Sequence, residues 1–122
     1  MAFTNPREKH PSTQRAYMGL SVAVWQDTGV KTDMIPAPGA GYCINIWAVF
    51  AFSNSTAIDA WGIGDGVATP ISVAATKTTS TNISLPMPVI FGDNKGIDII
   101  DTHGAITGSE KLTTVYYTIT PV

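Results

Sequence analysis

The sequence predicts an all-β fold, arranged as a single β-sandwich of about eight strands over residues 17–122. Apolar residues recur with a period of two in most segments, and no segment has the convincing apolar spacing of a helix. Turn-forming residues separate these segments at short, regular intervals, which is typical of sandwiches. A length of 122 residues corresponds to one domain with one core. Eight strands with this spacing favour a jelly roll.

Residues 1–16 are predicted to form an extended arm, because they contain two prolines and show no periodic pattern. Arg7, Lys9 and Arg15 against Glu8 give this arm a net charge of +2, whereas four basic and eight acidic residues give the remainder −4. A basic arm on an acidic body indicates contact with an acidic partner surface. A frayed, solvated terminus is the alternative.

The first two predicted strands lie before residue 36. Residues 17–25 alternate between two faces, and Trp25 lies on the less apolar one. The more apolar face carries Leu20, Val22 and Val24. Residues 30–35 are expected to form a second, short strand, which a loop rich in proline and glycine follows.

Residues 42–53 form the clearest predicted strand, which is apolar on both faces. One face carries Ile44, Ile46, Ala48, Phe50 and Phe52, and the other carries Cys43, Asn45, Trp47, Val49 and Ala51. Such a strand is either central and covered on both sides, or uses one face for the sandwich and the other for an interface. The single cysteine, Cys43, excludes an intrachain disulfide and is expected to be a small buried side chain.

The second half of the chain contains the remaining strands. They are predicted at residues 58–63, 67–73, 82–85, 89–91, 97–100 and 112–120. Gly64-Asp65-Gly66 is typical of a hairpin turn. Pro70 favours an edge position for its strand, and Pro86-Met87-Pro88 is expected to break the strand that contains it.

Few residues are suited to catalysis, and we expect no enzyme activity, cofactor or metal. Asp101 and His103 form a pair that can orient an imidazole as a general base, but no Gly-x-Ser-x-Gly motif supplies a nucleophile. The segment Asp93-Asn94-Lys95-Gly96 lacks the further ligands of a calcium loop. Two histidines and one cysteine show no zinc-ligand spacing.

The composition bears on the class of partner. A net charge of −2 argues against nucleic-acid binding. No apolar run reaches the roughly 18 residues of a membrane-spanning helix. Only 13% of the residues are charged, about half the usual share, which suits a β protein that partner subunits cover.

Aromatic residues are the remaining candidates for a binding site. Trp25, Trp47 and Trp61 lie opposite the most apolar face of their strands, and Tyr116 lies near a strand end. We interpret these four residues as a candidate subunit interface, since aromatic residues are enriched there. A sugar-stacking platform and the second face of the sandwich core remain alternatives.

Six segments follow one another in a characteristic order of strands and turns. They are Ile46–Asn54, Gly64-Asp65-Gly66, Thr76–Thr81, Pro88–Gly92, Ile97–Ile99 and Val115–Ile119. This order resembles small bacteriophage virion proteins of jelly-roll type. The resemblance implies a capsid decoration (cement) protein without catalytic residues, which is made in the host cytoplasm and stabilises the outside of the capsid in the virion.

The same resemblance carries expectations about partners. It implies homotrimers that bind the major capsid protein, with the N-terminal arm contacting neighbouring capsid subunits. A phage tail or fibre component is the alternative within that class. A receptor- or carbohydrate-binding β-sandwich module is the alternative from a different class.

Overall fold

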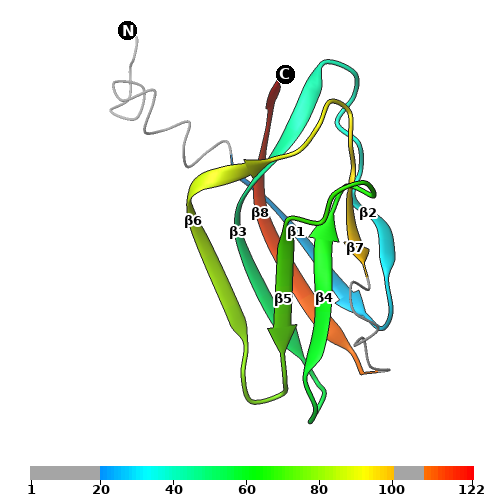
Figure 1. Cartoon of the computed structure of the whole chain (residues 1–122), viewed down its shortest axis with the longest axis vertical. Coiled ribbons are helices and arrows are strands. Elements are labelled where there is room, and N and C mark those ends of the chain that lie inside the picture. The colour runs from blue at the N-terminus through cyan, green and yellow to red at the C-terminus, as the bar shows by residue number, and fades with distance from the viewer. Residues whose placement is uncertain (1–19, 101–108) are drawn as a thin grey trace, which may run out of the picture.

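Eight strands form two four-stranded antiparallel sheets in the computed structural model, which describes residues 20–100 and 109–122 (Figure 1). No helix occurs in these ranges, and the all-β prediction is confirmed. The predicted arm at residues 1–16 and the pair Asp101 and His103 lie outside the described residues.

The strands divide equally between the two sheets. Sheet A contains, in spatial order, β1 (Ser21–Asp27), β8 (Lys111–Pro121), β3 (Tyr42–Ser53) and β6 (Thr81–Ile90). Sheet B contains β2 (Lys31–Ile35), β7 (Ile97–Ile100), β4 (Asp59–Gly64) and β5 (Ile71–Ala75). The predicted edge position next to Pro70 is correct for β5, although the strand begins after the proline.

Strand pairing is nested along the chain. β1 pairs with β8, β2 with β7, β3 with β6 and β4 with β5, in each case antiparallel. Only the turn between β4 and β5 joins neighbours in the same sheet, and each other connection leads from one sheet to the other. The described chain therefore resembles one long hairpin folded over on itself, so that its first and last strands, β1 and β8, pair in sheet A (Figure 1).

The core lies between the two sheets and consists of aliphatic side chains around one tryptophan. Its most deeply buried members are Ile35, Ile44, Ile46, Val49, Trp61, Ile63, Ile97, Ile99 and Val115. Each large aliphatic side chain stabilises the fold by about 1.5–3 kcal/mol when it is fully buried. Because both sheets contribute to this one cluster, they form a sandwich with a single core.

β3 contains a β-bulge at Trp47, which the sequence pattern does not predict. Ile46 lies opposite Tyr117 of β8 and Ala48 lies opposite Tyr116, so Trp47 is an extra residue on its strand. One extra residue reverses the faces of all the following side chains. The predicted uninterrupted alternation is therefore wrong. The inward set is Ile44, Ile46, Val49 and Ala51, and the outward set is Ala48, Phe50 and Phe52.

β1 turns its less apolar face toward the core. Ala23 and Trp25 pack against the core cluster, whereas Val22 and Val24 are 54% and 61% exposed. A tryptophan buries more apolar area than a valine, so the inward position of Trp25 gains more than it loses. Two valines are left on the outer face of sheet A.

The run Pro86-Met87-Pro88 does not break its strand, contrary to the prediction. β6 is an edge strand, where a proline without an N–H group is tolerated. The run also falls at a shift in the pairing, since Ser84 lies opposite Ala48 and Val89 lies opposite Ile46. The residues between Ser84 and Val89 are therefore outside the regular ladder.

The predicted turn between β4 and β5 is held by Asp65. Its Oδ1 accepts hydrogen bonds from the backbone N–H groups of Val67 (2.9 Å) and Ala68 (2.8 Å). These bonds, with that from Ala68 the largest contribution, hold the pKa of Asp65 below its usual value against the opposing effect of partial burial. A Cβ atom on Gly64 would lie 2.2 Å from the carbonyl oxygen of Ala68, so only glycine fits there.

Candidate binding surface on sheet A

The outer face of sheet A presents three rows of side chains that run across its strands. The first row is Val22, Tyr116, Ala48 and Ser84; the second is Val24, Thr114, Phe50 and Asn82; the third is Gln26, Leu112 and Phe52. We call these three rows the sheet A face. The face follows from the alternation of β-strands, because the residues between these positions point into the core.

Apolar side chains dominate the sheet A face. Val22 and Val24 are more than half exposed, and Tyr116 is 37% exposed. Phe50, Phe52 and Leu112 are half-buried, because neighbouring strands shield them from the side. Contiguous apolar surface of this kind marks a site of contact with another molecule in soluble proteins.

No row of the sheet A face contains an aspartate, glutamate, lysine, arginine or histidine. The carboxylate of Glu110 reaches only its rim, where it accepts a hydrogen bond from Gln26. The outer face of sheet B differs, since it carries Asp98 opposite Gly64. The two outer surfaces of the sandwich are therefore unlike in charge.

A network of hydrogen bonds between uncharged side chains lies on sheet A next to the first of the three rows. The side-chain amide Nδ2 of Asn45 donates to the hydroxyls of Thr118 (3.2 Å) and Thr120 (2.8 Å). Nε1 of Trp47 donates to the same Thr118 hydroxyl at 3.1 Å. The Cys43 thiol is buried, as expected, with its sulfur 3.6 Å from the hydroxyl of Thr120. These side chains are fixed in place without any charge.

The four predicted aromatic residues lie on different sides of sheet A or within the core. Trp61 is completely buried, so it has no surface for a partner, and Trp25 packs against the core. These two tryptophans therefore follow the core alternative. Tyr116 lies on the sheet A face, and Trp47 lies beside it at the bulge.

Of the sheet A face, the sequence pattern singles out only Tyr116 as an interface residue. The apolar members that it misses are Val22, Val24, Ala48, Phe50, Phe52 and Leu112. The signal that pointed toward them is the apolar character of both faces of residues 42–53, which indicated an interface on one side. The β-bulge at Trp47 determines which side chains of this strand lie on the outer, interface side.

Two charged side chains, Lys111 and Asp59, are completely buried in the sandwich. The Nζ atom of Lys111 is 5.8 Å from the ring centre of Trp25 and 5.9 Å from that of Trp61, and it donates to the Gly29 carbonyl at 3.3 Å. Asp59 accepts a 3.0 Å hydrogen bond from Ser53. Buried charges persist only with such partners.

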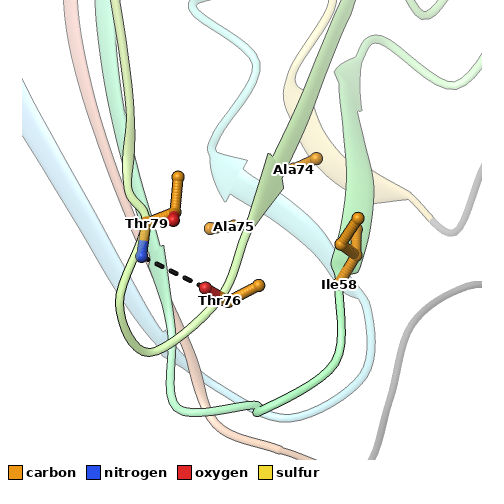
Figure 2. A pocket seen from close by; sticks show the side chains of 5 residues that line it. All are labelled: Ile58, Ala74, Ala75, Thr76 and Thr79. Carbon is orange, nitrogen blue, oxygen red and sulfur yellow. Dashed lines mark hydrogen bonds between the residues drawn. The ribbon is translucent and has the colours of Figure 1, made fainter.

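One small pocket lies beside the start of β4 and the end of β5. Its volume is about 240 Å³, and it is lined by Ile58, Ala74, Ala75, Thr76 and Thr79 (Figure 2). The backbone N–H of Thr79 donates to the Thr76 hydroxyl at 3.1 Å and closes the adjoining turn. The lining contains methyl groups and two hydroxyls, and none of its five residues has an acidic, basic or imidazole side chain.

The sheet A face is the main feature that bears on function. No protein-family model matches the sequence, and no curated protein is detectably similar to it. Within residues 20–100 and 109–122, no group of three or more histidine, cysteine, aspartate or glutamate side chains is placed to hold a metal ion. The same residues include no helix that is long and apolar enough to cross a membrane.

Proposed function

We propose that this protein is a non-enzymatic structural component of a larger assembly, which binds partner protein through the sheet A face. The observation that carries this proposal is the sheet A face itself: three rows of mostly apolar side chains without an ionic group. Interfaces between subunits have such apolar centres depleted in charge. A stable sandwich has no need of an exposed apolar surface on its outer side.

The specific form that we propose is a decoration protein on the outside of a phage capsid, with the major capsid protein as partner. The nested strand pairing supports the jelly-roll form of the sandwich, which is widespread among viral capsid proteins and lectins. The low share of charged residues and the order of strands and turns agree with a subunit whose surface is largely covered by partner subunits in the assembly.

The basic residues of the N-terminal segment supply a second contact in this proposal. Arg7, Lys9 and Arg15 are three of the seven basic residues of the chain and lie within nine positions of one another, so they are suited to an acidic surface on the capsid. Attachment that depends on them weakens as salt is raised, because screening shortens the range of charge attraction. Deletion of residues 2–15 should leave a folded domain with poor attachment, and unchanged attachment would contradict this part of the proposal.

The test of the proposed function is the copy number of the protein in purified particles from its source. Quantitative mass spectrometry gives the ratio of this chain to the major capsid protein. A high and fixed ratio supports a decoration role. A few copies per particle would move the protein to the tail, a fibre or a vertex, and absence from particles would overturn the proposal.

A carbohydrate-binding module is the second candidate, because Tyr116 is exposed on the sheet A face and Trp47 lies close to it. Sugar rings stack on such aromatic side chains. Titration of the intrinsic tryptophan fluorescence with a panel of sugars tests this candidate. A saturable change that Trp47→Phe and Tyr116→Ala remove would favour it over the structural role.

A further inference from the structure

We propose that the sheet A face binds a second copy of this chain, packed face to face about a two-fold axis. This inference rests on the proposed function, in which the same face is a docking surface. In the proposed function this face binds capsid protein, whereas here a second copy of the chain occupies it. It also differs from the trimer that the family resemblance implies, because a two-fold contact joins two copies.

The absence of charge on the sheet A face favours a copy of itself as the partner. A two-fold contact places the same surface patch on both sides, so a charged residue near the axis would meet its own like charge. The chain has 16 charged side chains in all, 7 basic and 9 acidic, yet none lies in the three rows. A face that recognised an acidic or basic partner would carry the complementary charge.

The polar groups of the sheet A face are also able to pair with themselves. Thr114 lies in the middle row between Val24 and Phe50, and Ser84 and Tyr116 lie in the first row. A hydroxyl group both donates and accepts hydrogen bonds. Two identical copies can therefore satisfy each other's hydroxyls, which two ammonium groups or two carboxylates cannot do.

The size of the face sets the expected strength of this contact. Strands lie about 4.8 Å apart and side chains on one face recur about every 7 Å, so four strands and three rows cover roughly 400 Å² in outline. A standard stable interface buries about 800 Å² on each partner. A pair formed by this face alone therefore belongs to the weak, reversible class, with a dissociation constant expected in the micromolar range.

The experiment compares the full chain with two charge variants by sedimentation equilibrium over the micromolar range. Val24→Glu places a carboxylate in the middle row of the sheet A face, at a position that is 61% exposed. Ser72→Glu is the matched control, because it adds the same charge at an exposed position of β5, an edge strand of sheet B. The Ser72 side chain lies on the outer face of that sheet. Circular dichroism checks that both variants fold.

We expect the wild type and Ser72→Glu to form dimers with similar dissociation constants. Val24→Glu should weaken the dimer at least about tenfold, since each dimer gains two facing carboxylates. A wild type that stays monomeric throughout this range would overturn the inference. The inference would also be overturned by an oligomer that Val24→Glu leaves unchanged, or by a trimer that both variants weaken to the same extent.

Attachment to particles that lack the protein separates this inference from the proposed function. A monomeric wild type whose attachment is abolished by Val24→Glu would overturn the self-association while supporting the docking role of the face. A wild type that dimerises through the face and attaches to no particle would support the self-association and overturn the proposed function.

Discussion

The indole Nε1 of Trp61 donates a 2.9 Å hydrogen bond to the hydroxyl of Thr113 across the interior of the sandwich. Trp61 belongs to β4 in sheet B and Thr113 to β8 in sheet A, and both side chains are completely buried. A buried indole N–H needs an acceptor, since water cannot reach it. This bond therefore joins the two sheets at a fixed relative position.

Removal of the acceptor should destabilise the sandwich. Thr113→Val leaves the indole N–H of Trp61 without its partner, which costs about 1–3 kcal/mol of unfolding free energy. Thr113→Ser keeps the hydroxyl and is the control for the bond. Urea unfolding followed by tryptophan fluorescence measures both variants. Equal stability of Thr113→Val and the wild type would show that the bond contributes nothing.

Gly64→Ala should destabilise the turn between β4 and β5. The added Cβ would lie 2.2 Å from the carbonyl oxygen of Ala68, so the backbone would have to move. We expect a loss of about 1–3 kcal/mol, the usual cost of forced overpacking. Gly92→Ala is the control, because its Cβ would meet only the flexible Lys95 side chain at 3.5 Å. Thermal unfolding should separate the two variants, and coinciding curves would contradict the geometry.

Asp65 should make the stability of the domain depend on pH in the acidic range. Its pKa in the folded state is lowered from 3.8, so its ionised form stabilises the fold above the unfolded-state pKa. This contribution is lost as the pH falls through the lowered pKa. Asp65→Asn keeps an acceptor oxygen but does not titrate, so its unfolding free energy should fall less steeply below about pH 4. Urea unfolding of the wild type and of Asp65→Asn over a series of pH values tests this assignment. Equal slopes of the unfolding free energy against pH would refute it.

The bulge at Trp47 can be checked with two valines. Val49 lies after the bulge and is buried in the core, whereas Val22 of β1 is more than half exposed. Val49→Ala should cost about 1–3 kcal/mol, since it removes two buried carbon atoms and leaves a cavity. Val22→Ala should change the unfolding free energy by less than about 0.5 kcal/mol. A cost at Val49 as small as the one at Val22 would contradict the bulge, because it would place Val49 on the outer face of sheet A.

Most strands could be predicted from the sequence because glycine, proline and asparagine mark their ends, although Pro86 and Pro88 lie inside β6 and mark no end. The turn at Gly64 illustrates this, since its local hydrogen bonds depend only on residues close together in the chain. The faces of the strands were harder to predict. A period of two cannot reveal an inserted residue such as Trp47 when both faces of the strand are apolar.

The candidate binding surface was only partly predictable for the same reason. Tyr116 was selected because aromatic residues favour interfaces, and the structure places it on the sheet A face. Trp61 was selected on the same ground and belongs to the core. Val24 was overlooked, because an apolar stripe is ordinarily expected to face inward. Tertiary packing of the larger Trp25 decided the orientation of β1.

The nested pairing of the strands has a consequence for how the molecule is synthesised. β8 is the last strand of the chain, yet it lies between β1 and β3 in sheet A. The β4–β5 hairpin can close early, because its contacts are local, whereas Ser21 must find Tyr117 across nearly the whole domain. During synthesis, β1 and β3 each have an edge of unpaired backbone N–H and C=O groups until β8 emerges from the ribosome. The domain therefore completes its fold only after β8 has left the ribosome, and insertion of β8 between its neighbours is expected to limit the rate of refolding.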